Sequence, residues 1–231
     1  MYGTIPPTTT LHQPSNRTTM QPLALLSLWL VPASFSVVTA FAPTSYALPR
    51  LPSTSLWASA LIVQNKGGGH GELGYQLAKV LENSEKIDSI TILQDDAAKE
   101  SSEPFKSYST DLPNVKIVKA PLGEDSLTAD SLQALLGEDT TFDYVWDNAS
   151  KNAQGAGKAV CDCAKAWNVK LLTYVSSAGM YQPPAHGPFP MPETTPVKES
   201  AGQNQYDQYA VSLGLPLVSF RPQYICKDPK K

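Results

Sequence analysis

The chain has 231 residues, 42% of them apolar, and a formal net charge of −3, which is enough length and apolar content for one globular domain with a substantial core. Residues 1–65 contain two arginines and no acidic residue, so the remainder, with 16 basic and 21 acidic residues, carries about −5. That acidic balance argues against a dedicated basic nucleic-acid module, and three cysteines exclude a disulfide framework.

The N-terminal part reads as a targeting segment. An apolar run at 23–31 followed by small residues is typical of a signal peptide and too short for a comfortable membrane span. A Phe-Ala-Pro start and a Ser/Pro-rich stretch without acids then follow, as in transit peptides. This two-part arrangement resembles the presequences of algae with secondary plastids and predicts plastid import, with ordinary secretion as the alternative. We assign 1–40 to an upstream segment and signal peptide, 41–58 to a plastid transit segment, and 59–231 to the folded domain.

Strand-like and helix-like segments alternate from residue 60 onward, which is typical of α/β proteins with a parallel sheet. The apolar runs predict six strands at 60–64, 89–93, 115–118, 142–146, 170–176 and 216–220. Helical spacing predicts helices at 72–83, 127–136, 152–167 and 201–212. Right-handed crossovers would give a doubly wound parallel sheet, with ligands at the carboxyl ends of its strands.

A glycine-rich turn joins the first predicted strand to the first predicted helix. Gly68, Gly71 and Gly74 are spaced three apart there. Glycines at such a turn let the backbone approach a pyrophosphate, which the free N–H groups at the helix start can bind. These glycines are our predicted phosphate site, with a turn that binds no ligand as the alternative. His70 lies inside the turn and could act as a general acid or base, although a surface histidine is more common.

Several motifs resemble the extended short-chain dehydrogenase/reductase superfamily, whose members include NAD-dependent epimerases and dehydratases. Beside the glycine spacing, Asp147-Asn148 follows the fourth predicted strand, where that superfamily has a loop next to the cofactor. The segment 176–181 follows the fifth strand, where it has its catalytic serine, and Arg221-Pro222 follows the sixth. The resemblance implies a Rossmann-like domain that binds NAD or NADP. It also implies a C-terminal substrate domain, which we expect to be missing here.

A closer resemblance is to the plastid stem-loop-binding proteins, atypical members of that superfamily known as RNA-binding proteins and endoribonucleases. It rests on matches at 67–70, 104–106, 147–148, 176–179 and 219–224. The resemblance implies that the chain binds plastid RNA and either cleaves or stabilises transcripts.

No Tyr-x-x-x-Lys pair follows the fifth predicted strand, where dehydrogenases and epimerases of this superfamily carry the pair with which they transfer protons. The one match in the sequence, Tyr75-x-x-x-Lys79, lies in the first predicted helix. Tyr206 is followed four residues later by Ala210, and Tyr181 by Ala185. Standard hydride-transfer chemistry is therefore not expected. An epimerase-, dehydratase- or reductase-type enzyme is our alternative function, and a non-catalytic dinucleotide-binding scaffold is the second alternative.

Three further residues complete the candidate site. Asp95 follows the second predicted strand and could bind a ribose hydroxyl, which would favour NAD over NADP; a solvated loop acid is the alternative. Ser177 could donate a hydrogen bond to a ligand, but without Tyr and Lys partners a structural role is expected. Asp147 could hold a divalent metal ion for RNA cleavage, or cap a helix.

The remaining candidates are weaker. Lys151, Lys158 and Lys165 share a helical face that is either solvated or in contact with RNA phosphates. Cys161 and Cys163 are two residues apart in a predicted helix, so we expect buried or half-exposed thiols and no metal site. We expect no membrane association of the mature protein, and homo-oligomer formation stays open.

Overall fold

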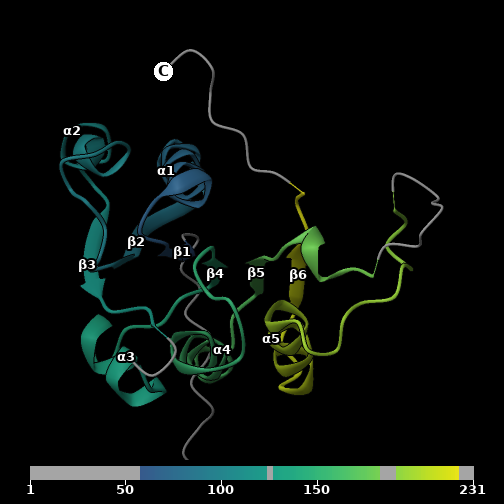
Figure 1. Ribbon diagram of the computed structural model, residues 1–231. Coiled ribbons are helices and arrows are strands. Elements are labelled where there is room, and N and C mark those ends of the chain that lie inside the picture. Colours follow the sequence, from purple (N-terminus) through teal and green to yellow (C-terminus); the bar gives the residue numbers. More distant parts are fainter. Residues whose placement is uncertain (1–57, 124–126, 183–190, 224–231) are drawn as a thin grey trace, which may run out of the picture. The chain divides into compact units, whose positions relative to one another are not determined.

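The computed structural model describes residues 58–123, 127–182 and 191–223, without the side chains of 68–70 (Figure 1). Residues 1–57, which hold the predicted signal peptide and all but the last residue of the predicted transit segment, and Cys226 lie outside the described residues. Ala58, assigned to the transit segment, is the first residue of the first strand. Among the described residues, no helix has both the length and the apolar character needed to cross a bilayer.

Six parallel strands form one sheet in the order β3-β2-β1-β4-β5-β6. Their bounds are Ala58–Gln64 (β1), Ile87–Asp95 (β2), Lys116–Ala120 (β3), Tyr144–Asp147 (β4), Leu171–Val175 (β5) and Leu217–Phe220 (β6). The order places β1 near the middle, between β2 and β4. The predicted doubly wound parallel sheet is therefore confirmed.

Helices cover both faces of the sheet. They are α1 (Gly68–Glu82), the 3₁₀ helix η1 (Phe105–Ser107), α2 (Tyr108–Asp111), α3 (Ala129–Leu136), α4 (Gly155–Trp167), the 3₁₀ helix η2 (Ala178–Met180) and α5 (Gly202–Ser212). Figure 1 shows α1 and α2 on one face and α3, α4 and α5 on the other. Right-handed crossovers require this division, because the chain runs outward from β1 in one direction and from β4 in the other.

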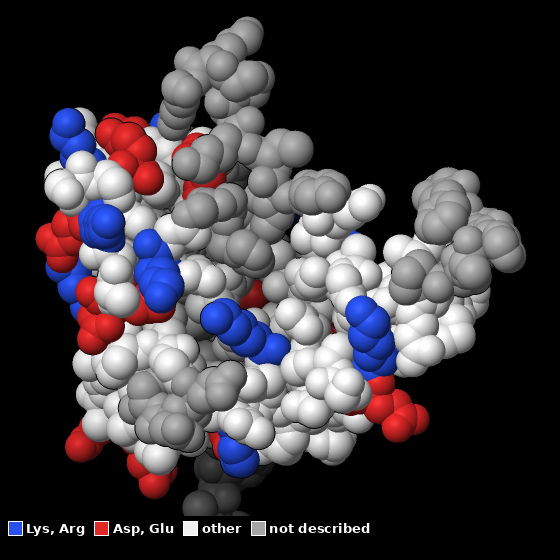
Figure 2. All heavy atoms as spheres, viewed as in Figure 1, with Lys and Arg blue, Asp and Glu red and all other residues white. Residues whose placement is uncertain are grey.

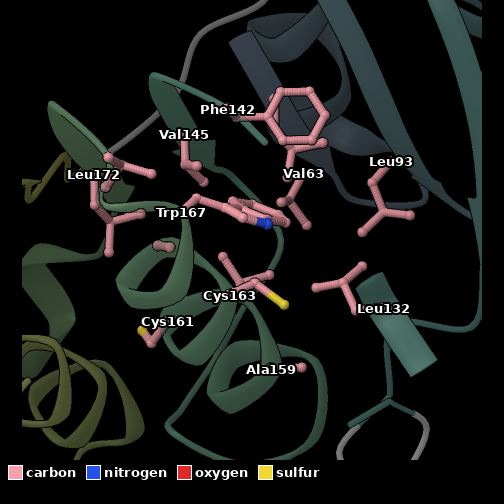
Figure 3. Close-up of a cluster of buried hydrophobic side chains, with 14 of the residues drawn as sticks. Val63, Leu93, Leu132, Phe142, Val145, Ala159, Cys161, Cys163, Trp167 and Leu172 are labelled. Carbon is pink, nitrogen blue, oxygen red and sulfur yellow. The ribbon is translucent and has the colours of Figure 1, made fainter. Parts of the chain in front are cut away.

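The core has two parts because the central strands are buried on both faces. Leu61 and Val63 of β1 face the cluster formed with α3 and α4, whereas Ile62 faces the cluster formed with α1 and α2. Successive side chains of a strand point to opposite faces, so a continuous apolar run marks such a doubly buried strand. Figure 3 shows the larger cluster, in which Trp167 lies among strand and helix side chains. The Trp167 indole also donates a hydrogen bond to Gln133 Oε1 at 2.6 Å.

Local signals explain where α3 begins and ends. The Thr128 hydroxyl oxygen accepts from the Ser131 N–H at 3.2 Å, and the Ser131 hydroxyl oxygen accepts from the Thr128 N–H at 2.9 Å. These reciprocal bonds satisfy two N–H groups that the first helical turn leaves free. Gly137 follows the helix with a φ of 121°, which other residues rarely adopt.

Two boundaries differ from the sequence prediction in ways that affect the site. The first helix begins at Gly68 rather than at residue 72, so Gly71 and Gly74 lie inside it. The polar segment 95–113, for which no helix was predicted, contains η1 and α2. These short helices form because Phe105 and Tyr108 are buried in the core on the α1 side.

Candidate functional site

The carboxyl ends of four strands surround a small crevice. Asn65 and Lys66 follow β1, Asp95 ends β2, Leu122 follows β3 and Lys151 follows β4, and all line a cavity of about 150 Å³. The crevice lies between β1 and β4, where the crossovers change from one face of the sheet to the other. Open α/β sheets bind ligands at this kind of switch point. The cavity is therefore the candidate functional site.

The glycine turn beside the crevice is shaped by contacts within the protein. A Cβ atom at Gly74 would lie 1.5 Å from Oε1 of Gln64, so any other residue there would force the buried Gln64 amide to move. A Cβ at Gly71 would lie 3.3 Å from the Phe105 ring and 3.4 Å from Nε2 of Gln64. Close helix–strand packing is one of the uses of glycine in dinucleotide-binding turns.

Other residues of the turn are placed by the backbone alone. Gly67 precedes α1 with a φ of 153°, and Gly68 begins the helix. The side chain of His70 lies outside what the structure describes. Phosphate binding by Gly68, Gly71 and Gly74 and the proposed roles of His70 remain predictions.

Buried amide side chains join the strand ends beneath the crevice. The Gln64 side chain is fully buried, and its Oε1 accepts from Nδ2 of Asn148 at 3.3 Å. Nε2 of Gln94 donates to the backbone oxygens of Asn65 at 3.2 Å and Asp95 at 3.3 Å. Sequence reasoning missed Gln64 and Gln94. A polar residue at the end of a buried apolar strand could have indicated them, because a buried amide without a hydrogen-bond partner is energetically costly.

Asp95 occupies the position that the ribose prediction requires. It is half-buried at the end of β2 and lines the crevice. Its Oδ1 accepts from the Ala97 N–H at 3.0 Å, which holds the carboxylate at the turn after the strand. Ribose binding by Asp95 remains a prediction.

The environment of Asp147 differs from the one expected for a metal ligand. Its side chain is completely buried, Oδ1 accepts from the N–H groups of Ala149 at 3.0 Å and Ser150 at 2.9 Å, and Oδ2 accepts from the Tyr206 hydroxyl at 2.8 Å. Burial raises the pKa of Asp147, and the hydrogen bonds from Ser150, Ala149 and Tyr206 oppose that shift. The carboxylate satisfies N–H groups of the turn that follows β4. It does not cap a helix, as the alternative supposed, because α4 begins at Gly155 with Gln154 as its N-cap.

The described residues contain no group of three or more His, Cys, Asp or Glu side chains that could hold a metal ion. Cys161 and Cys163 are buried and free, as predicted. Burial raises the pKa of both thiols, to about 12 for Cys161 and about 11 for Cys163, which keeps them protonated and unreactive.

Ser177 also has local partners. Its hydroxyl oxygen accepts from the Gly179 N–H at 3.1 Å and so begins η2. Nζ of Lys198 reaches the same turn and donates to the Gly179 oxygen at 3.0 Å. This geometry agrees with the structural role expected for Ser177.

Tyr206 cannot take the place of the missing catalytic tyrosine in this arrangement. Its ring is fully buried and stacks on Tyr174, with centroids 3.9 Å apart. Burial, and next the negative charge of Asp147, raise the pKa of Tyr206 well above its usual value. A catalytic phenol of this superfamily needs the opposite conditions, namely access to substrate and a lowered pKa.

A second polar cluster lies beside β6. Arg221 donates to Asp207 Oδ2 at 3.1 Å and to the Tyr181 hydroxyl at 2.9 Å, and these residues line a cavity of about 610 Å³. Sequence reasoning noted Arg221 only as part of a motif. Its partners come from η2 and α5, so their meeting depends on the tertiary structure.

Comparison with known proteins bears on the fold. No protein-family model and no curated protein matches the sequence. A dTDP-glucose 4,6-dehydratase from Bacillus anthracis, solved with NAD, has a TM-score of 0.53 and 16% identity over 71% of this chain and 54% of that one. WbmG of Bordetella bronchiseptica, with NAD and UDP, has a TM-score of 0.52 and 18% identity over 71% and 53%. An epimerase from Methanothermobacter thermautotrophicus has a TM-score of 0.51 and 18% identity over 71% of this chain and 51% of that one.

At these identities the similarity shows the fold alone. The neighbours share a Rossmann-like sheet with this chain and are epimerases, dehydratases and related enzymes, two of them solved with NAD. The chain spans about half the length of these neighbours. None of the three is described as an RNA-binding protein.

Proposed function

We propose that this chain binds NAD or NADP at the crevice between β1 and β4. The observation that carries the proposal is the convergence of four strand ends on one cavity, with a carboxylate at the end of β2. The fold likeness to enzymes solved with NAD supports it. The cavity, at about 150 Å³, is below the roughly 300 Å³ of sites that enclose a whole ligand, so a dinucleotide would lie partly along the surface.

The proposal favours NAD over NADP. Asp95 lines the crevice, and the exposed Asp96 follows it. A carboxylate at this point can accept hydrogen bonds from the hydroxyls of an adenosine ribose, whereas it would repel a 2′-phosphate. Both acids therefore disfavour the phosphorylated dinucleotide.

We separate binding from catalysis. A bound nicotinamide supplies hydride transfer, but Tyr206 is buried against Asp147 and no Tyr-x-x-x-Lys pair follows β5. The Tyr75-x-x-x-Lys79 match lies in α1, where Tyr75 is buried. Proton transfer of the usual superfamily kind therefore has no matching residues. We propose that the chain shares a dinucleotide site with the epimerase and dehydratase neighbours without using their usual proton donor.

Calorimetric titration with NAD⁺, NADH and NADP⁺ tests this proposal. We expect NAD⁺ to bind more tightly than NADP⁺, and Asp95→Asn to reduce or reverse that preference. Asp88→Asn is the matched control, because Asp88 is exposed near the other end of the same strand. Failure of all three dinucleotides to bind at millimolar concentration would remove the proposal. NAD-dependent turnover would contradict the separation from catalysis.

Plastid RNA binding, with transcript stabilisation or endonucleolytic cleavage, is the second candidate. It is supported by the sequence motifs shared with the stem-loop-binding proteins and by the presequence. Figure 2 shows basic and acidic side chains interspersed on the described part of one face. Lys158 of the predicted lysine face is paired with Asp162 at 2.6 Å. Titration of the mature protein with a labelled plastid stem-loop over a salt series tests this candidate, and no binding at low salt would remove it.

A further inference from the structure

Two lysines from different loops line the crevice. Lys66 follows β1 and Lys151 follows β4, and both belong to the cavity that Asp95 also lines. Both are exposed, and neither has an ion-pair partner within the described ranges. In contrast, Lys158 and Lys170 are each paired with a carboxylate. Among the described residues that line the crevice, the charged side chains are those of two lysines and of Asp95.

The loop that carries Lys151 is held firmly from within. Its first residue, Asp147, accepts two backbone N–H groups and the Tyr206 hydroxyl. The Tyr174 hydroxyl donates to the Ser150 backbone oxygen at 3.0 Å. The rings of Tyr174 and Tyr206 stack on each other, so β5 and α5, which carry them, both contact the loop. We call Tyr174 and Tyr206 the tyrosine clamp.

Glycines bring two helices against the same loop. A Cβ at Gly202, the first residue of α5, would lie 2.4 Å from the Lys151 backbone oxygen. A Cβ at Gly157 of α4 would lie 2.1 Å from the Asn152 backbone oxygen. Such packing fixes the backbone of Lys151, so only its side chain loses freedom when it binds an anion.

The glycine turn contributes backbone groups to the predicted phosphate site, and the two lysines can add positive charge. At Gly71 and Gly74 the direction of the missing Cβ is occupied by Gln64 and Phe105, so their lack of a side chain serves internal packing. The glycines carry no charged side chain, so positive side-chain charge for a bound phosphate has to come from neighbouring residues. Ammonium groups at the ends of two adjacent strands supply it within one cavity.

We propose that Lys66 and Lys151 form a diphosphate-binding site, with the tyrosine clamp as its positioning element. We name a diphosphate because two lysines line the same cavity, of about 150 Å³, and a diphosphate carries charge on both of its phosphate groups. The site rests on the proposed function in one respect: its natural diphosphate would be the bridge of the dinucleotide. Asp95 would then lie beside the ribose.

The test uses calorimetric titration of the full chain with inorganic pyrophosphate, NAD⁺ and adenosine at low salt. Lys66→Gln and Lys151→Gln should each raise the Kd for pyrophosphate and NAD⁺ about fivefold, and together about 25-fold. Adenosine binding should not change, since it carries no phosphate. Lys165→Gln, at the far end of α4, is the control and should change Kd less than about twofold.

The outcomes separate this inference from the dinucleotide proposal. Lysine-dependent binding of pyrophosphate without NAD⁺ binding supports the site and removes the dinucleotide function. NAD⁺ binding that is unchanged in the double variant overturns the site and leaves the function standing. Absence of pyrophosphate binding overturns the site as well. If the variants weaken only a plastid stem-loop RNA, the diphosphate assignment is also wrong.

The clamp is tested through Tyr206→Phe, with Tyr209→Phe as control because the Tyr209 hydroxyl contacts Asp162 instead. We expect Tyr206→Phe to raise the pyrophosphate Kd about two- to threefold and to speed amide exchange at Ala149 and Ser150. Urea unfolding of each variant verifies that the protein is folded at the titration temperature. Faster exchange without a change in Kd would overturn the positioning role.

Discussion

The turn between β1 and α1 and the loop between β4 and α4 follow neighbouring strands and line the same crevice, yet they are held in different ways. The first is close-packed because side chains are missing: Gly71 and Gly74 admit Gln64 and Phe105. The second is held by a buried carboxylate, Asp147, and by the phenols above it. A glycine pattern thus indicates that other atoms come close to the backbone, but it does not indicate whether those atoms belong to a ligand or to the protein itself.

Substitutions in these two regions should destabilise the protein for different reasons. In the glycine turn any added side chain must displace buried atoms, so the penalty is steric. In the β4–α4 loop the penalty comes from leaving a buried polar group without its partner. Substitutions in the two regions should therefore differ in size, in pH dependence and in how they can be rescued.

The largest expected effect is at Gly74. Gly74→Ala should reduce the free energy of unfolding by about 3 kcal/mol, because the new Cβ would overlap the buried Gln64 amide. An alanine inside a helix would otherwise stabilise it by about 1 kcal/mol. Urea unfolding measures the difference, and Gly71→Ala, with contacts of 3.3 to 3.4 Å, should cost less.

A double-variant cycle sharpens this prediction. Gln64→Ala removes the obstructing amide, so Gly74→Ala should cost less in that background than in the wild type. Equal costs in both backgrounds would mean that Gln64 is not the source of the penalty.

A smaller effect is expected at the tyrosine clamp. Tyr206→Phe should cost about 2 kcal/mol, because Asp147 Oδ2 stays buried and loses its hydrogen-bond donor. Chemical unfolding of Tyr206→Phe and Tyr209→Phe measures this, and the second variant should be close to the wild type. If Tyr209→Phe lowered the free energy of unfolding as much as Tyr206→Phe, the buried Tyr206–Asp147 hydrogen bond would not be the cause of the loss.

The smallest effect is a change in pH dependence. Burial raises the pKa of folded Asp147 above its ordinary value of 3.8, so the folded protein holds this proton more tightly than the unfolded chain. Ionisation of Asp147 therefore lowers the free energy of unfolding as pH rises from 3.8 to the raised pKa of the folded state. Above that raised pKa the loss of stability is complete. Asp147→Asn removes the titrating group.

The free energy of unfolding of Asp147→Asn, measured from pH 3 to pH 8, should accordingly rise relative to the wild type across that window and then run parallel to it. Parallel curves throughout would show that Asp147 titrates normally when folded. Lys165→Ala, an exposed change on α4 that breaks no ion pair among the described residues, serves as the reference for a pH-independent offset.

Local pattern explains why the fold could be predicted. Strands and amphipathic helices differ in the spacing of their apolar residues, and each of the six strands predicted between residues 60 and 220 overlaps a strand of the sheet. The missed helices η1 and α2 lack that signal, since α2 has only four residues and Phe105 and Tyr108 are buried through tertiary contacts. The start of α1 was missed because glycine has low helix propensity.

The candidate site was less predictable. Asp95 and the glycine turn lie beside the crevice, as their positions after strands imply. The sequence could not show that Asp147 is buried, because its partner Tyr206 is 59 residues away. It also suggested a helical face for Lys151, whereas Lys151 precedes α4 and lines the crevice.

By itself the sequence determined the order of strands and helices along the chain, the glycine turn after β1 and the lack of a Tyr-x-x-x-Lys pair after β5, because these depend on residue type and short-range spacing. The tertiary structure alone decided what fills the space at Gly74, what binds Asp147 and which lysines share a cavity. Those outcomes depend on how distant elements pack, and packing distances of a few ångströms are not encoded in any local pattern.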